Sequence, residues 1–231
     1  MALNFTISKG AIPAPQVVSP ATVANRAGTS RALAFTHPIL TIDQTGISYK
    51  QRVQAGVREF SFDFGTIRIT LRQDVLIASD LTPCEQRKWA AHERGHVNDN
   101  RGIMDNLEAE VMNYGLMQDV FVNGQWYPRT DFNLIQQLIE NDVGTAFRTL
   151  EAAAVAAHDT TAEYRRVARE ILRDCPGPIR YVVQSGDTLS QIALHYYGNA
   201  SKWRKIYDAN VGVIGANPHF IRAGDTIVIP R

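Results

Sequence analysis

The feature that most constrains this chain is a short pattern near its centre, in which His92, Glu93 and His96 spell H-E-x-x-H. In a helix, residues four apart lie one turn apart on the same face, so the two imidazoles can meet one metal ion. Neutral imidazoles suit zinc, and a glutamate beside them can act as a general base. We therefore expect His92 and His96 to be zinc ligands and Glu93 to be the catalytic base.

Helix-start signals lie just before this pattern. Thr82 is a good N-cap, Pro83 falls at the first helical position, and Glu85 follows the cap by three residues, which makes a capping box. These signals predict a helix from Pro83 to about Asn98. The alternative is that two histidines and a glutamate meet the pattern by accident on a solvated helix face.

A catalytic zinc site needs a third protein ligand, with water in the fourth position. Residues 98–102 read as a turn, and a second helix is expected from Asp105 to about Gln118. An antiparallel helix pair would bring Glu108 back beside His96, so we predict Glu108 as the third ligand. Glu108 can also be read as a capping-box glutamate after Asp105. The other candidate ligands are Glu110, Asp99, Asp105 and His158.

The motif followed by an acidic helix resembles the zincin metallopeptidases, and the gluzincin arrangement in particular. The resemblance covers roughly residues 57 to 118. The H-x-x-G-x-x-H extension of metzincins is absent, and the spacing from His96 to Glu108 is short for gluzincins. The resemblance implies a Zn²⁺ cofactor and hydrolysis, in which Glu93 takes a proton from water and gives it to the leaving amine. A donor for the developing oxyanion is also needed, and the candidates are Tyr114, His158 and Tyr164.

Strand signals precede the motif. Apolar and polar residues alternate along 60–64 and along 67–71, which predicts two half-buried antiparallel strands with a tight turn at Gly65. A third, shorter strand is expected at 75–78. Combined with the helices, these strands predict an α+β fold class: a small antiparallel sheet plus helices of zincin-like type.

Further elements are expected after the second helix. An Asn-Gly pair at 123–124, between apolar residues, is a hairpin signal. Asp131 is expected to cap a long helix from Phe132 to about His158. A capping box at Thr160 then opens another helix that ends near Cys175, where a Pro-Gly-Pro run follows.

The clearest module in the chain begins at Tyr181. A short strand leads through Ser-Gly-Asp-Thr-Leu into a helix, a Tyr-Gly-Asn break precedes a second helix at 201–210, and residues 221–230 close with a turn and a strand. This βααβ order resembles a LysM domain. The matching segments are Val-x-x-Gly-Asp-Thr-Leu at the start, Trp203 and Ile206 to Asn210 in the middle, and Gly-Asp-Thr-Ile-Val-Ile-Pro at the end.

The LysM resemblance implies binding to glycans that contain N-acetylglucosamine, such as peptidoglycan or chitin. The family's sugar groove lies between the loop before the first helix and the loop after the second. The corresponding residues here are Gly186, Asp187, Thr188, Leu189, Asn217, Pro218 and Ile221. The alternative is a compact docking module with no glycan, as found in baseplate and spike proteins of phage tails and contractile injection systems.

These signals divide the chain into four parts. Residues 1–38 are expected to be an extended Pro/Ala-rich arm, and residues 39–176 the zincin-like metallopeptidase domain. Residues 177–180 would form a linker, and residues 181–231 the LysM domain.

Composition narrows the partners and the compartment. A net charge of +1 over 231 residues, with no basic run, does not favour nucleic acid, and no apolar run reaches the length of a membrane span. No secretion signal is recognisable, so we expect a protein that is made in the cytoplasm and either stays there or is released by a particle or by lysis. Cys84 and Cys175 are expected to be unpaired thiols in a reducing compartment. They can pair only if the first turn of the motif helix approaches the end of the main domain.

Two functions compete at this point. The first is a zinc-dependent hydrolase of the metallopeptidase type that acts on protein or peptide and is targeted to cell-wall glycan by a LysM domain. The second is a structural component of a phage-like or contractile injection particle, in which the LysM module docks particle proteins and the H-E-x-x-H helix is not catalytic. A third possibility joins them: a peptidoglycan-acting hydrolase carried by such a particle.

Overall fold

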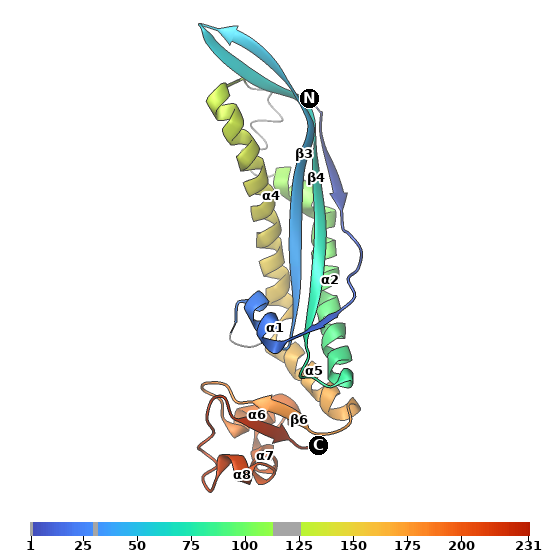
Figure 1. Ribbon diagram of the computed structural model, residues 1–231, viewed down its shortest axis with the longest axis vertical. Coiled ribbons are helices and arrows are strands. Elements are labelled where there is room, and N and C mark those ends of the chain that lie inside the picture. Colours follow the sequence, from blue (N-terminus) through green and yellow to red (C-terminus); the bar gives the residue numbers. More distant parts are fainter. Residues whose placement is uncertain (1, 30–31, 113–125) are drawn as a thin grey trace.

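The computed structural model describes residues 2–29, 32–112 and 126–231. The molecule is elongated, with a long β-hairpin at one end and the C-terminal module at the other (Figure 1). Two long helices, α2 (Pro83–Met112) and α4 (Arg129–His158), run beside the hairpin between these ends.

One long strand, β4 (Val57–Ala78), organises the main sheet. β3 (Ala34–Gln54) pairs with it in antiparallel register. β1 (Ala2–Ser8) and β2 (Gln16–Val18) pair with it in parallel, and the short β5 (Tyr127–Pro128) pairs antiparallel near its start. The mixed helix and strand content agrees with the predicted α+β class.

The predicted turn at Gly65 is wrong. Gly65 lies inside β4 and pairs with β1, and the chain turns instead at Ala55 and Gly56, whose φ angles are +50° and +78°. Opposite Gly65, the register of β3 shifts between Thr45 and Ser48. A glycine within a strand pattern here marks an irregularity in the partner strand and not a chain reversal. Residues 75–78, expected as a separate strand, are the end of β4.

The first 38 residues do not form an extended arm outside the core. β1, β2 and the start of β3 are strands of the sheet, and α1 (Pro20–Ala27) covers it with Val23 fully buried. Ser19 caps this helix by accepting from the Thr22 amide at 3.2 Å, and Pro20 falls in the first turn, where proline is tolerated. The prolines therefore mark boundaries between short elements.

The predicted start of α2 is confirmed, but its predicted end is wrong. Thr82 and Glu85 form the capping box, with bonds of 3.3 and 2.8 Å to each other's amides. The helix continues through 98–102, where a turn was expected. Asn100 is buried there and donates to the Gln73 side chain of β4 at 2.9 Å. This buried amide therefore has a hydrogen-bond partner in the sheet while the segment stays helical.

Packing against the sheet extends α2 further. Met104, Leu107 and Val111 are buried in a cluster that joins α2, α4 and β4. A second cluster joins the start of α2 to α5 (Thr161–Asp174) and to the C-terminal module. The core is therefore continuous from the sheet into the module.

The junction of α4 and α5 is sharp. α4 ends at His158 as predicted, although it begins at Arg129, so Asp131 lies within it and not at its cap. Thr160 caps α5 by accepting from the Glu163 amide at 3.2 Å, which confirms the predicted cap. Tyr114 and the expected Asn-Gly turn lie outside the described residues.

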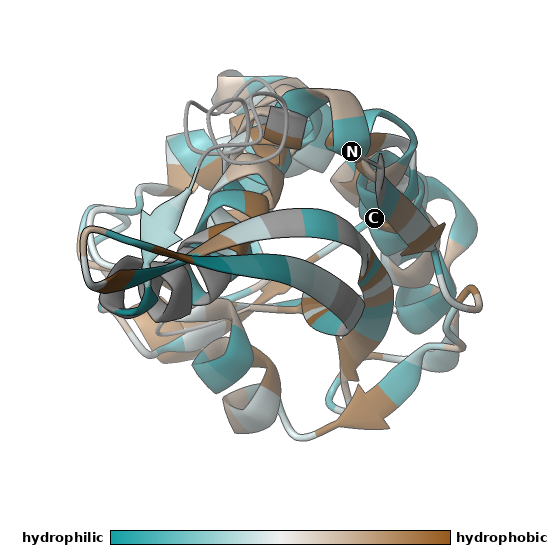
Figure 2. Ribbon diagram, turned by 90° about the horizontal axis from the view of Figure 1, so that it is seen from above, coloured by the Kyte–Doolittle hydropathy of each residue, from teal (hydrophilic) through white to brown (hydrophobic). Residues whose placement is uncertain are grey.

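Seen along the long axis, hydrophilic and hydrophobic residues alternate along the elements (Figure 2). No described helix is long and apolar enough to cross a membrane.

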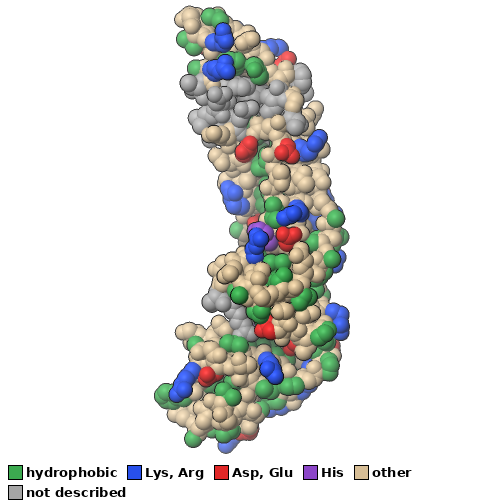
Figure 3. All heavy atoms as spheres, viewed as in Figure 1, with side chains coloured by type: hydrophobic (Ala, Val, Ile, Leu, Met, Phe, Trp, Pro, Cys, Tyr) green, Lys and Arg blue, Asp and Glu red, His purple; other side chains and the backbone are tan. Residues whose placement is uncertain are grey.

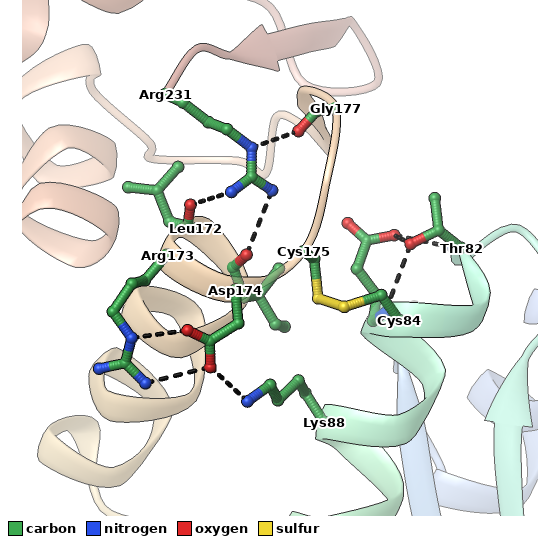
Figure 4. Close-up of a disulfide and its surroundings, with 11 residues drawn as sticks. Thr82, Cys84, Lys88, Leu172, Arg173, Asp174, Cys175, Gly177 and Arg231 are labelled. Atoms are coloured by element: carbon green, nitrogen blue, oxygen red, sulfur yellow. Dashed lines mark hydrogen bonds and ion pairs between the residues drawn. A yellow bond between two sulfur atoms is a disulfide. The ribbon is translucent and has the colours of Figure 1, made fainter.

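The two cysteines form a disulfide, which corrects the expectation of free thiols. Cys84 in the first turn of α2 is bonded to Cys175 directly after α5, across 91 residues of sequence (Figure 4). Lys88 pairs with Asp174 at 2.6 Å beside the bond, and Arg231 donates to backbone carbonyls at the end of α5. The motif helix, α5 and the chain's last residue are thus held together at one place.

The C-terminal module has the predicted βααβ order. β6 (Ile179–Val182) pairs antiparallel with β7 (Thr226–Ile229), and α6 (Leu189–Tyr197) starts at a capping box between Thr188 and Gln191. The 3₁₀ turn η2 (Ala200–Lys202), α7 (Trp203–Asp208) and α8 (Val211–Ile214) follow.

Candidate metal centre

The centre is built where α2 passes the corner between α4 and α5. His92, Glu93 and His96 are all buried on α2. The corner supplies His158 as the last residue of α4 and Asp159 as the residue that follows it. Residues more than sixty positions apart in the sequence therefore meet at one point.

Three imidazoles converge in this centre. One ligand nitrogen from each of His92, His96 and His158 lies within 4.8 Å of the others. The ligands of a tetrahedral zinc with Zn–N bonds of about 2.0–2.1 Å stand about 3.4 Å apart, so a small inward movement of these side chains would complete the site. Three histidines with an open fourth position are a donor set typical of catalytic zinc.

Asp159 approaches the same point. Its Oδ1 lies 2.8 Å from Nε2 of His96 and 3.3 Å from Nε2 of His92. A carboxylate oxygen between two converging imidazole nitrogens can act as a further oxygen ligand or can orient the imidazoles. Neither role was predicted from the sequence.

Two outer carboxylates lie near the Nδ1 atoms of His158 and His92. Oδ2 of Asp99 lies 3.1 Å from Nδ1 of His158, within ion-pair distance. Nδ1 of His92 is buried, and Glu163 Oε1, at 3.5 Å, faces it without forming a hydrogen bond of good geometry. Arg166 binds Glu163 and, more than any other group, lowers the pKa of that carboxyl to about 2. Carboxylates in these positions favour imidazole tautomers whose Nε2 atoms face the metal position.

Gly95 creates the space for His158. A Cβ atom built on Gly95 would lie 2.0 Å from Cε1 and 2.4 Å from Nε2 of the His158 ring. Any larger residue at this position would force the ring away. The glycine within the motif, H-E-R-G-H, therefore allows the third imidazole to lie directly on the backbone of α2.

Glu93 faces β3 as well as the centre. Thr36 Oγ1 donates to Glu93 Oε2 at 2.7 Å. The pKa of Glu93 is raised to about 7, chiefly by burial; the bond from Thr36 opposes the rise and the Asp159 carboxylate adds to it. A carboxyl group with a pKa near neutrality suits a general base that must also release its proton.

His96 and Tyr164 complete the electrostatic picture. Burial lowers the pKa of His96, as do the neighbouring His158 and His92 rings, against the opposing effect of Asp159. The neutral imidazole is the form that binds metal. Tyr164 on α5 has its ring centroid 5.4 Å from that of His92, and burial followed by Asp159 raises the pKa of its hydroxyl, which keeps it protonated.

The structure does not bring Glu108 to the motif. Because α2 is one continuous helix, Glu108 lies about 18 Å along the axis from His96, at 1.5 Å per residue, and it is exposed. Glu110 lies further along, and Asp105 pairs with Lys9. Of the named alternatives, His158 joins the cluster and Asp99 supports it from behind.

Two oxyanion-donor candidates can now be ranked. His158 belongs to the group of histidines that could hold a metal, whereas Tyr164 lies beside His92 and lines the cavity. No sequence pattern pointed to Asp159, Thr36 or Gly95 as members of this site. The capping signal at Thr160 was the closest one, because it placed the helix junction that carries His158 and Asp159.

A cavity of about 600 Å³ opens from the centre toward the C-terminal module. Glu93, His96, Asp159 and Tyr164 line its inner end. The face of β6 and α6 lines the opposite side.

In the C-terminal module, two of the residues predicted to bind glycan have structural roles. Asp187 Oδ2 accepts from the Tyr181 hydroxyl and from the Gln184 amide, both at 2.7 Å, so it shapes the loop before α6. The Leu189 side chain is buried in the core. The other predicted positions are on the surface or partly buried: Gly186, Thr188, Asn217, Pro218 and Ile221.

The family model of the LysM domain matches residues 181–230. This segment is a LysM domain. It is 44% identical over 51 residues to the potassium binding protein Kbp of Escherichia coli, a match that covers 22% of this chain and 34% of that protein. The chain thus spans about a third of the length of this curated relative. The presence of a LysM domain is evidence for binding to peptidoglycan and other glycans that contain N-acetylglucosamine. No solved structure matches the chain.

Proposed function

We propose that the chain is a zinc-dependent hydrolase of the metallopeptidase type, brought to the cell wall by its LysM domain. The observation that carries this proposal is the convergence of His92, His96 and His158 beside a buried Glu93 at the end of a cavity. Three imidazoles alone would also suit a structural metal. The buried carboxyl of Glu93 and the adjoining cavity favour a catalytic site over a structural one.

Zinc bound by the three histidines would polarise a substrate carbonyl and lower the pKa of water. Glu93 would take the proton from that water and return it to the leaving amine. Thr36 holds the Glu93 carboxyl in position through its 2.7 Å hydrogen bond. The protonated hydroxyl of Tyr164 is suited to donate to the carbonyl oxygen as negative charge develops there.

The disulfide bears on where the enzyme acts. A bond between Cys84 and Cys175 persists in an oxidising environment. It favours action outside the cytoplasm after synthesis inside it, with delivery by a particle or by cell lysis. Peptidoglycan lies in such an environment, which agrees with the LysM domain.

The test is a Glu93→Gln variant of the full chain, loaded with one equivalent of zinc. We expect zinc content and LysM binding to peptidoglycan to be unchanged and peptide hydrolysis to fall by a factor of roughly 100 or more, the usual contribution of a general base. Glu108→Gln, exposed on the same helix, is the matched control and should hydrolyse at the wild-type rate. A Glu93→Gln variant as active as wild type would overturn the proposal.

A second candidate function rests on the other end of the molecule. At the tip of the β3–β4 hairpin, Tyr49, Val53 and Val57 expose between 49% and 68% of their surfaces. Figure 3 shows hydrophobic and basic side chains together at this end. A projecting hairpin of this kind could dock a protein, which agrees with a component of a phage-like particle. Absence of both zinc binding and hydrolysis would favour this reading.

A further inference from the structure

The cavity beside the metal centre has one wall from the LysM domain. Arg180 and Tyr181 of β6, Gln184, and His195 and Tyr196 of α6 line that wall. The glycan groove expected for the family uses the loops at 186–189 and 217–221, so most of the cavity wall belongs to a different face of the module. One small domain therefore has two separate surfaces available for binding.

The lining is predominantly apolar. The residues that give it this character, from the start of β3 to α4, are Leu33, Ala34, Phe35, Leu81, Trp89 and Val155. Sugar recognition needs several free hydrogen-bonding groups, whereas apolar side chains of a peptide need only such a surface. This chemistry favours a peptide over a glycan.

Several polar groups in the lining are already engaged. Glu85 is bonded to Thr82, Tyr181 to Asp187, and Asn100 to Gln73. Their hydrogen-bonding capacity is used to hold the walls together. A carbohydrate entering the cavity would have to compete for these groups.

Charge is divided between the two ends. Glu93 and Asp159 lie at the metal end, Glu85 is bonded to Thr82, and Arg180 lies on the LysM wall. Burial lowers the pKa of His195, and so do the nearby Arg165 and Arg169 of α5, against the opposing effect of the Asp187 carboxylate. An acidic group of a ligand is therefore best placed on the LysM side.

We infer that the cavity binds an extended peptide segment with bulky apolar side chains and an acidic residue toward the LysM wall, so that the LysM domain contributes to peptide recognition through a face other than its glycan groove. This inference rests on the proposed function and names its substrate class. It selects protein segments over the small, polar stem peptides of peptidoglycan. Continuity of the cavity with Glu93 and His96 is the reason to expect a substrate there.

Binding and cleavage can be tested separately. The zinc-loaded Glu93→Gln chain would be titrated with a twelve-residue peptide that has Leu-Phe at its centre and Glu two residues later, and with a matched peptide carrying Ser-Ser. The apolar peptide is expected to bind at least tenfold more tightly, which corresponds to about 1.4 kcal/mol. A soluble muropeptide serves as the competing ligand.

Variants locate the site on the two walls. Val155→Asp puts a charge into the apolar lining and should weaken binding of the apolar peptide at least tenfold. Ala156→Asp, on the next residue of α4, should not weaken it. Arg180→Glu should weaken the same peptide, and Arg204→Glu, exposed on α7, should not. Zinc content is measured for each variant.

The outcomes separate the two proposals. If the apolar peptide binds tightly, the variants weaken its binding and wild type does not cleave it, the peptide site is supported and the proposed hydrolase activity is overturned. Equal binding of both peptides, or tighter binding of the muropeptide with loss in Val155→Asp, would overturn the peptide inference. Cleavage confined to peptidoglycan stem peptides would also overturn it and leave the hydrolase standing.

Discussion

The LysM domain and the metal centre differ in how their parts come together. In the LysM domain, the capping box at Thr188, the break at Gly198 and the closing strand all lie within about fifty residues. In the metal centre, His96 and His158 are brought together from 62 positions apart by packing of α2 against α4 and α5. Local signals define the first region, and only tertiary structure defines the second.

Among the tests of this difference, removal of the disulfide is expected to have the largest effect. Cys84→Ser with Cys175→Ser opens a link across 91 residues, and we expect a loss of about 2–4 kcal/mol in the free energy of unfolding. Chemical denaturation with and without reductant measures it. Because the bond joins α2 to α5 next to the centre, zinc affinity should fall while binding of the LysM domain to peptidoglycan persists. Equal loss of both activities would show that the two regions do not behave separately.

A second test destabilises only the LysM domain. Asn210 is buried and its side chain bonds to the backbone of Ile206 and Val228, with three bonds of 2.7 Å. Asn210→Ala leaves these backbone groups short of partners, so we expect a loss of about 1–3 kcal/mol. Thermal unfolding should show it, with zinc stoichiometry unchanged. Asn199→Ala, at the exposed cap of η2, should cost less.

A third test acts on the metal centre with little effect on folding. Gly95→Ala places a methyl group where the His158 ring lies, and this terminal ring can swing aside. We expect zinc affinity to fall at least tenfold, about 1.4 kcal/mol, with little change in overall stability. In Gly102→Ala, where a Cβ meets nothing, affinity should be unchanged and the helix about 0.5–1 kcal/mol more stable. Competition with a zinc chelator measures both.

The same difference explains what the sequence could predict. The helical position of the H-E-x-x-H motif, the Thr82 and Thr160 caps, the end of α4 and the LysM order depend on neighbours within a few turns, and these predictions hold in the structure. The turn at Gly65 and the break at 98–102 were wrong because contacts from β1 and from Gln73 stabilise regular structure through those positions. Glu108 failed as a ligand for that reason, since the break was needed to bring it back.

The cysteines illustrate the same limit. Pairing of Cys84 with Cys175 required the start of α2 to meet the end of α5, and no local pattern reports this. Packing of Trp89 against Tyr164, with ring centroids 6.1 Å apart, is part of what brings the two helices together. The condition for pairing could be stated from the sequence, but whether it was met could not.

The most direct test of the account is zinc stoichiometry by elemental analysis in three proteins: wild type, His158→Ala and Glu108→Ala, each checked for folding by circular dichroism. We predict about one zinc per chain in wild type and in Glu108→Ala, and a loss of tight zinc in His158→Ala. Zinc that survives in His158→Ala but disappears in Glu108→Ala would contradict the three-histidine centre. No zinc in any of the three would contradict the metal site itself.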